Sequence, residues 1–341
     1  MPTFLIGKNE KVKSIVERGD VDSKHDNRHN LNGNPIARDS LALMLTVPEL
    51  GLAGWVYPTV NGEGVAVSAV CLFGEGVGSP IYEKCIEEVP AEMDFFDWNT
   101  GSLTMKIGEP NQSFSVSWRG EKVELDFHYD ALHPAFAFSL GPEGSPPYYG
   151  DDRIEQHGKI KGTITAAGKK FDFETFMIKD HSWGPRVWGL NQHHKWIHAV
   201  TENVSIHFFE MQSFGKNHLQ GFLSKDGVVS QLETVEYDFE LNDNLELESM
   251  LLNVKDMEGR TATAECEVYA HIVATDIEKK SISNAESESA THYSFDKDQV
   301  TQLNEGAMTV VIDGKKGIGW AEFAWNKNYL DYSRNHSSFR K

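Results

Sequence analysis

The side chains best suited to chemistry gather between residues 179 and 196. They form the run Lys179-Asp-His-Ser-Trp-Gly-Pro-Arg-Val-Trp188, followed by Gln192-His-His-Lys-Trp196. On an extended strand, His181 and Trp183 share one face, and Asp180 and Ser182 share the other. An in-line Asp-His-Ser triad is therefore excluded, because neighbouring strand residues point apart and a triad must converge. His181, beside an aromatic wall, is a candidate general acid or base.

A structural role accounts for the same residues without catalysis. The glycine and proline after Trp183 should end the strand, which places Arg186 and Trp188 on a connection. Asp180 and Arg186 would then form an ion pair across the turn, while Trp183 fills a core. The residues by themselves leave both interpretations open.

A second candidate, Glu210, is an acidic residue inside the apolar run Val204-Ser-Ile-His-Phe-Phe-Glu-Met211. Alternation places Ile206, Phe208 and Glu210 on one face of a strand. Burial beside apolar side chains raises the pKa of a carboxyl group, and such a group can donate a proton near neutral pH. In the alternative, Glu210 meets solvent at the strand end or pairs with Lys195.

Metal and cofactor motifs are weak in this sequence. His193, His194 and His198 could approach a common ion, but no His-Glu-x-x-His pattern supports a metal. The glycines near positions 62 and 74 lack the strand-turn-helix context of a dinucleotide site, and hairpin turns explain them better. We therefore predict no metal and no cofactor. Glu322, on a late strand, could face the same cavity as Glu210, although we favour a solvated position.

The elements that must position these residues are strands. Short runs of β-branched and aromatic residues, separated by Gly, Pro, Asn and Asp, recur from residue 41 onward. Most alternate with period two, as Glu121-Lys-Val-Glu-Leu-Asp-Phe-His128 does, which is typical of half-buried strands. The best helix candidates are short, at Pro80–Glu88 and Asp296–Leu303. Many short strands with turn signals predict an all-β protein of barrels or sandwiches.

An internal repeat indicates two similar domains. Gly162-Thr-Ile-Thr-Ala-Ala-Gly-Lys-Lys170 resembles Gly306-Ala-Met-Thr-Val-Val-Ile-Asp-Gly-Lys-Lys316, and the two copies start 144 residues apart. Trp55 and Trp196, which each open an apolar strand, are 141 residues apart. Two offsets this close favour duplicated β domains. We therefore divide the chain into a polar N-terminal leader or loop that buries little (1–40), an N-terminal domain (41–190) and a C-terminal domain (191–341).

Composition excludes several classes of function. The chain of 341 residues carries 32 Lys and Arg against 51 Asp and Glu, a formal net charge of −19. Phosphate backbones and anionic membranes recruit basic surfaces, so we expect no nucleic-acid partner and no membrane docking. No apolar run approaches the roughly 20 residues that span a bilayer, and we see no signal peptide. Three cysteines without metal-type spacing favour a reducing, cytoplasmic location. The oligomeric state stays open, a homodimer included.

The motif residues resemble a known family. A strand–Gly-turn–strand hairpin ending in Asp180-His-Ser-Trp-Gly-Pro-Arg186, a Trp-rich linker and a closing Gly317-x-Gly-x-x-Glu322 are similar to the tandem lipocalin-like proteins. That group includes the AttH-like proteins and the hydroxyneurosporene synthases, which are carotenoid hydratases. The resemblance implies two calycin-type antiparallel barrels with few short helices, and an apolar cavity for a hydrophobic small molecule. It also implies hydration, dehydration, isomerisation or cyclisation without a redox cofactor.

The resemblance further implies roles for single residues. His181 and Trp183 match a His and a Trp that are implicated in the activity of the carotenoid hydratases. Glu210 stands where those enzymes have an Asp, and so keeps an acid. Phe208 replaces a Tyr and lacks its phenol, which argues against the same substrate.

From these observations we predict a cofactor-independent lyase, hydratase or isomerase acting on a hydrophobic, terpenoid-like or aromatic small molecule in a β-barrel cavity. Glu210 would transfer the proton, and His181 would orient it or act as its partner. Asp180 and Arg186 would form a structural pair. Aromatic side chains would line the cavity and stabilise cationic character through their π faces: Trp183, Trp188, Trp196, Phe208 and Tyr57. The alternative is a non-enzymatic carrier of an apolar ligand.

Overall fold

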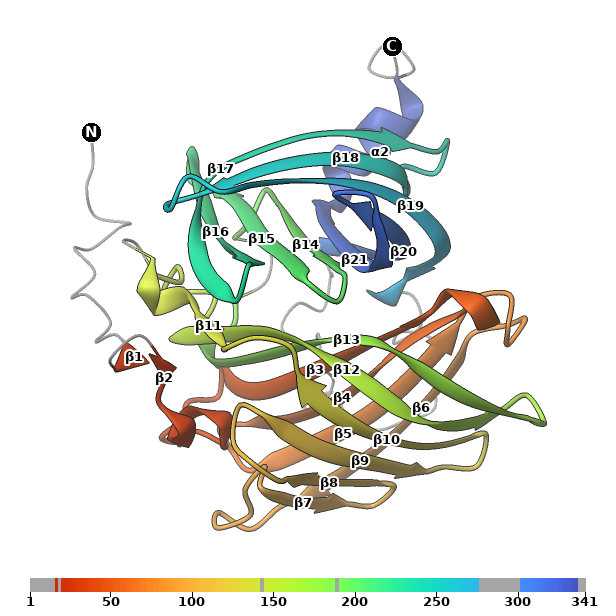
Figure 1. Ribbon diagram of the computed structural model, residues 1–341. Coiled ribbons are helices and arrows are strands. Elements are labelled where there is room, and N and C mark those ends of the chain that lie inside the picture. Colours follow the sequence, from red (N-terminus) through yellow and green to blue (C-terminus); the bar gives the residue numbers. More distant parts are fainter. Residues whose placement is uncertain (1–15, 18–19, 142–143, 188–189, 276–300, 337–341) are drawn as a thin grey trace.

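Two large antiparallel β-sheets follow one another along the chain (Figure 1). The computed structural model describes residues 16–17, 20–141, 144–187, 190–275 and 301–336. Among these residues, no helix is both long enough and apolar enough to cross a membrane. The all-β prediction is confirmed, since the long strands form two antiparallel sheets.

The N-terminal sheet has 11 strands and curls into an incomplete barrel. Its order is β6-β5-β4-β3-β13-β12-β10-β9-β8-β7, and β11 pairs with β12. The strands are β3 (Ala37–Val47), β4 (Leu52–Asn61), β5 (Val65–Phe73), β6 (Ile81–Glu88), β7 (Asp97–Thr100), β8 (Leu103–Ile107), β9 (Ser113–Arg119), β10 (Val123–Ala131), β11 (Phe136–Ala137), β12 (Asp152–Ala166) and β13 (Lys169–Pro185). The edge strands β6 and β7 are in contact where the side chain of Cys85 reaches the backbone, since Cys85 Sγ lies 3.3 Å from the Thr100 carbonyl oxygen.

The second sheet is a closed barrel, which runs from β14 to β21 in chain order and is completed by the pairing of β21 with β14. Its strands are β14 (His193–Val200), β15 (Val204–Ser213), β16 (Lys216–Lys225), β17 (Val228–Leu241), β18 (Leu247–Asp256), β19 (Thr261–Val273), β20 (Thr301–Ile312) and β21 (Lys315–Asn326). The smaller elements are β1 (Val16–Glu17), β2 (Asp20–Val21), η1 (Ser23–Asp26), η2 (Pro48–Leu50), η3 (Phe138–Leu140) and α2 (Lys327–Asn335).

Period-two alternation explains how each sheet makes its own core. On β10, Leu125, Phe127 and Tyr129 are buried, whereas Asp126 and His128 between them are half-buried and exposed, respectively. The buried side chains join an apolar cluster inside the N-terminal sheet. A separate apolar cluster fills the C-terminal barrel. Burying one face of each strand in this way is the main stabilising contribution of a sheet.

A third apolar cluster lies between the two sheets and draws residues from both. Trp55 of β4 meets Trp320 of β21 edge to face, with ring centroids 6.4 Å apart. The strands at this interface are buried on both faces, so residues 152–158 of β12 and 177–184 of β13 are buried without interruption. The motif found in the sequence therefore lies in the seam between the sheets, where alternating side chains point into two different environments.

Some sequence predictions are wrong in detail. Pro80–Glu88 is not helical, because its residues from Ile81 onward form β6. Asp296–Leu303 lies largely outside the described residues, and its last three residues begin β20. The segment before β3 buries more than we predicted: Asp26 is buried and pairs with the ammonium group of Lys179 inside the N-terminal sheet.

The two Gly-Lys-Lys hairpins occupy corresponding places in the two sheets. They form the β12–β13 and β20–β21 turns, and β13 and β21 each pair with the first long strand of their sheet, β3 and β14. The tryptophan part of the repeat does not correspond in this way. Trp55 lies on the second long strand of its sheet and Trp196 on the first. Their similar spacing is a coincidence of loop lengths.

Candidate functional site between the two sheets

A cavity lies between the outer face of the N-terminal sheet and the C-terminal barrel. Five charged side chains line it: Arg38, Arg153, Asp180, Glu305 and Glu322. The space that a water-sized sphere can enter is about 50 Å³, which is room for a few water molecules. A concave site with several convergent charged groups is the usual setting for acid–base chemistry.

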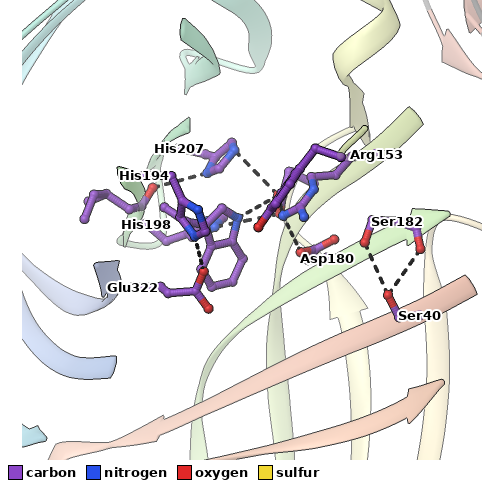
Figure 2. Close-up of polar contacts among 12 residues, drawn as sticks. Ser40, Arg153, Asp180, Ser182, His194, His198, His207 and Glu322 are labelled. Carbon is purple, nitrogen blue, oxygen red and sulfur yellow. Dashed lines mark hydrogen bonds and ion pairs between the residues drawn. The ribbon is translucent and has the colours of Figure 1, made fainter. Parts of the chain in front are cut away.

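Two glutamates face each other on the barrel side of this cavity. Glu305 of β20 and Glu322 of β21 are directly paired across the sheet, and their side chains hydrogen-bond. Trp320 Nε1 donates to Glu305 Oε2 at 2.6 Å. His194 Nε2 lies 2.6 Å from Glu322 Oε1. Each carboxyl group thus has its own second partner (Figure 2 shows the His194–Glu322 contact).

The surroundings of Glu305 and Glu322 shift the pKa values of the two carboxyl groups in opposite directions. Burial raises the pKa of Glu305 well above its usual value, and the neighbouring Glu322 carboxylate raises it further. Burial also acts to raise the pKa of Glu322, but the hydrogen bonds from His194 and Glu305 outweigh burial and lower it. The two directions favour a state in which Glu305 keeps its proton and Glu322 carries the negative charge.

On the opposite side of the cavity, Arg153 bridges two buried acids. Its Nη1 lies 2.7 Å from Asp180 Oδ2 and 3.4 Å from Glu155 Oε1 (Figure 2). The guanidinium also sits over the ring of Phe209, 5.2 Å from its centroid. A cation buried among carboxylates keeps its position, because moving away from either partner would leave an uncompensated buried charge. Arg153 therefore supplies a fixed positive charge at the wall of the cavity.

Aromatic side chains, together with Ala42 and Met44, form the rest of the wall. Trp55, Tyr57, Tyr149 and Trp196 all line the cavity. Trp196 is fixed by its Nε1, which donates to Glu155 Oε1 at 2.7 Å. A neutral acid, an ionised base and aromatic walls together suit proton transfer to and from a hydrophobic molecule.

The family of the chain follows from a family model that matches residues 22–327, described as a domain of unknown function, DUF7064. The chain belongs to the DUF7064 family. No curated protein matches this DUF7064 chain in sequence.

Two solved structures share the fold of this DUF7064 protein. A candidate AttH protein from Nitrosomonas europaea has a TM-score of 0.60 at 14% identity, over 91% of this chain and 98% of its own. Kievitone hydratase from Nectria haematococca has a TM-score of 0.51 at 10% identity, over 87% of this chain and 92% of its own. These likenesses confirm the predicted resemblance to the AttH-like tandem lipocalin fold. At such identities they establish the fold alone.

The structure places the predicted aromatic residues in different locations. Tyr57 and Trp196 line the cavity between the two sheets, whereas we predicted a cavity inside a β-barrel. Trp183 instead stacks on His29, with ring centroids 3.6 Å apart. Phe208 is buried in the core of the C-terminal barrel. Trp188 lies outside the described residues.

Glu210 does not belong to the cavity of this DUF7064 protein. It faces the inside of the C-terminal barrel, where it accepts hydrogen bonds from Tyr237 and Lys195. Burial acts to raise the pKa of Glu210, but the Tyr237 and Lys195 contacts outweigh burial and lower it. The predicted raised pKa is therefore wrong, and pairing with Lys195, the alternative considered from the sequence, is what the structure shows.

His181 points into the N-terminal sheet, away from the C-terminal barrel. Its Nε2 lies 2.8 Å from Asp39 Oδ1, and its ring packs edge-on against Phe95 at 5.5 Å between centroids. Phe95 belongs to the core of that sheet, whereas Phe208, beside Glu210, belongs to the core of the barrel. The structure thus does not bring His181 and Glu210 together, because strand alternation turns them into two different cores.

The predicted Asp180–Arg186 ion pair is also replaced. Asp180 pairs with Arg153, and Arg186 donates to the carbonyl oxygen of Tyr149 and, at 2.9 Å, to Ser182 Oγ. Asp180 and Ser182 do lie on the face opposite His181, as alternation predicts. Arg186 therefore has the structural role that we predicted, but with different partners.

Sequence reasoning missed the glutamate that completes the acid pair. Glu305 alternates with Leu303 and Ala307, which both belong to the core between the sheets. An acid in the middle of an apolar stripe was the signal that drew attention to Glu210, and it could have identified Glu305 as well. For Glu322 the favoured solvated position is wrong, since it lines the cavity with its side chain 18% exposed.

Proposed function

We propose that this protein is a hydratase-type lyase, which adds water to, or removes it from, a hydrophobic small molecule held between the two sheets. The observation that carries the proposal is the pairing of protonated Glu305 with ionised Glu322 in one aromatic-walled cavity. Two carboxyl groups poised in opposite protonation states can serve as acid and base in one reaction.

The proton transfers can be written for hydration of a carbon–carbon double bond. Glu305 donates its proton to one carbon, and the π electrons form the new C–H bond. The oxygen of a water molecule bonds to the other carbon, while Glu322, held by His194, takes a proton from that water. Glu322 then returns the proton to Glu305 through their shared hydrogen bond, which restores the starting state. Dehydration is the same sequence in reverse.

Aromatic walls suit the substrate class that we predicted from the sequence. Trp55 and Trp196 line the cavity, and the π system of an aromatic ring stabilises positive charge that develops on carbon after protonation. Pockets for molecules of this kind usually measure about 300–1,000 Å³. The open space here is smaller, so the proposal includes a movement of wall side chains when substrate binds. The fold shared with kievitone hydratase supports hydration as the reaction type.

The test is turnover of kievitone and of other aromatic and terpenoid compounds with double bonds, in water labelled with the heavy oxygen isotope. Mass spectrometry of the product then detects labelled oxygen. We expect Glu305→Gln and Glu322→Gln to lower the rate by about 100-fold or more, since each removes one proton transfer. Glu267→Gln, the same change at an exposed position of β19, should keep the wild-type rate.

Two outcomes would contradict the proposal. A ligand that binds and is recovered chemically unchanged would favour the carrier that we considered from the sequence. A loss of rate in Glu210→Gln and His181→Ala, with full activity in Glu305→Gln, would favour the sequence-based assignment instead.

A further inference from the structure

Three buried side chains from different strands direct unpaired acceptor atoms toward one another. They are Glu155 of β12, His198 of β14 and His207 of β15, and each is 0% exposed. Among the described residues, Glu155 Oε2, His198 Nε2 and His207 Nε2 have no hydrogen-bond partner. His198 Nε2 lies 3.7 Å from Glu155 Oε2, and His207 Nε2 lies 3.6 Å from Glu155 Oε1. One ligand atom from each residue lies within 4.8 Å of the other two.

A chain of histidines determines which nitrogen of His198 carries its hydrogen. His133 Nδ1 lies 2.8 Å from the carbonyl oxygen of Pro134, which can only accept, so His133 Nε2 is an acceptor. His133 Nε2 accepts from the backbone N–H of His157 and also faces His157 Nδ1, each at 3.2 Å, so Nδ1 is the donor of its ring and His157 Nε2 is left as an acceptor. His198 Nδ1, 2.8 Å from His157 Nε2, must donate in turn. The Nε2 of a neutral His198 is therefore a bare lone pair.

The other two residues are oriented in the same manner. His207 Nδ1 lies 3.2 Å from the carbonyl oxygen of Ile197 and donates to it, so His207 Nε2 is also a bare lone pair. Glu155 Oε1 accepts from Trp196 Nε1 at 2.7 Å and lies 3.4 Å from Arg153 Nη1, which leaves Oε2 free. Such outer partners, which fix the tautomer and the orientation of each ligand, are characteristic of metal sites.

Three lone pairs facing one another away from water repel, and a cation between them relieves that repulsion. A single proton cannot join them, because 3.6–3.7 Å exceeds the length of a hydrogen bond. Around Zn²⁺, with bonds of about 2.0–2.1 Å, tetrahedral ligands lie about 3.4 Å apart. The two His–Glu distances are within a few tenths of an ångström of that spacing, and the three ligand atoms, which all lie within 4.8 Å of one another, would draw together by at most about 1.4 Å. We propose that Glu155, His198 and His207 form a binding site for a divalent transition metal of the Zn²⁺ type.

A second cluster of similar residue types does not require a cation between its members. His29, Asp39 and His181 also cluster, but both oxygens of Asp39 already accept hydrogen bonds. His181 Nε2 reaches Oδ1 at 2.8 Å, and His29 Nδ1 reaches Oδ2 at 3.0 Å. The polar atoms between these residues are thus satisfied without an ion. The trio serves as a matched control in the experiment.

The proposed site would connect the two halves of the molecule. Glu155 comes from the N-terminal sheet, and the two histidines come from the C-terminal barrel (Figure 2 shows His198 and His207 on the barrel side). A bound ion would therefore act as a cross-link between the sheets, and its removal should lower the melting temperature. This inference revises our expectation of no metal from the sequence, and it does not depend on the proposed reaction.

The experiment measures metal in the full-length protein. After expression with added zinc, elemental analysis should find one equivalent of metal per chain. After removal of metal by a chelator, Tm should fall, Zn²⁺ should restore it, and Co²⁺ should produce the visible absorption of a protein-bound ion. Glu155→Gln and His207→Gln should each weaken Zn²⁺ binding by more than about 100-fold, since even outer partners contribute 10–100-fold.

His29→Gln should retain one equivalent of metal and the full response of Tm to Zn²⁺. The proposal is overturned if the folded wild type contains no metal and neither its Tm nor its Co²⁺ absorption responds to added ions. It is equally overturned if His29→Gln loses the metal while Glu155→Gln and His207→Gln keep it. Circular dichroism of each variant separates loss of metal from loss of the fold.

Discussion

At the scale of single residues, the contacts of a buried glutamate decide whether its pKa is raised or lowered. Glu210, Glu305 and Glu322 each alternate with apolar residues on a strand of the C-terminal barrel. The pKa of Glu210 and of Glu322 is lowered because cationic or donating partners outweigh burial. Within the described part of the chain, Glu305 has no cationic partner of that kind, and burial beside Glu322 raises its pKa. The partner, which comes from another strand, decides whether a buried carboxyl group is an acid or a base.

The raised pKa of Glu305 predicts how stability changes with pH. Because the folded-state pKa lies above the unfolded value of 4.5, the stabilising contribution of Glu305 is complete below that pH and is lost as the pH rises through the folded-state pKa. We expect Glu305→Gln, which has no charge to lose, to gain stability relative to the wild type over that range. The gain should be about 1.4 kcal/mol per pH unit between the two pKa values.

Urea unfolding of both proteins at about pH 5 and about pH 8 measures this difference. Glu267→Gln, at an exposed position, should differ from the wild type by the same amount at both pH values. Parallel stability curves for Glu305→Gln and the wild type would show that Glu305 is ionised in the folded protein.

At the scale of elements, the glycines of the closing motif allow two strands to approach. A Cβ added at Gly317 of β21 would lie 1.9 Å from the carbonyl oxygen of Val200, and one at Gly319 would lie 2.5 Å from that of His198. Both contacts are with backbone atoms of β14, which cannot move without breaking the ladder that closes the barrel. The motif residues Gly317 and Gly319 therefore hold β14 and β21 together, and this pairing brings His194 to Glu322.

We expect Gly317→Ala to destabilise the protein by about 2 kcal/mol or more, because the added methyl group collides with backbone. Gly306→Ala is the matched control, since its Cβ would come closest to the side chain of Val268, at 3.2 Å, and would lie at an ordinary 3.9 Å from the carbonyl oxygen of Ala321. It should cost no more than about 1 kcal/mol. Thermal unfolding of both variants gives the comparison, and equal losses would mean that the close approach at Gly317 is not rigid.

At the scale of the whole molecule, the two sheets share a core and a polar seam. Phe222 of the barrel is fully buried and contacts rings on the N-terminal side, with centroids 5.0 Å from His133 and 5.3 Å from Phe136. The candidate site needs both halves, because Glu305 and Glu322 come from the barrel and Arg153 comes from the sheet. A cavity between two packed units is a common place for a ligand site.

This shared core predicts that the two sheets unfold together. Calorimetry of the wild type should show one transition, because neither sheet can expose the common apolar cluster without a large free-energy cost. Phe222→Ala should lower the unfolding free energy by about 3–5 kcal/mol through loss of buried contacts and the cavity left behind. Phe214→Ala, at a half-exposed turn position, should cost about 1 kcal/mol or less. Two separate wild-type transitions would contradict the shared core.

The sequence by itself determined most of the strands, the faces of those strands and the family resemblance, although it predicted a helix where β6 lies. Alternation is a property of the local backbone, so it correctly separated His181 from Asp180, and Phe208 and Glu210 from Phe209. The Gly-Lys-Lys repeat similarly located two corresponding hairpins. These features depend on residues close together in the chain.

Only the tertiary structure decided which faces meet. Alternation cannot say whether a face points into its own barrel or toward the other sheet, and that choice removed Glu210 and His181 from a common site. It also joined Glu305 to Glu322, and Glu155 to His198 and His207, across as many as 52 residues. The physical reason is that protonation states and ligand geometry depend on charges and donors a few ångströms away in space, which strand pairing and packing bring together from distant parts of the chain.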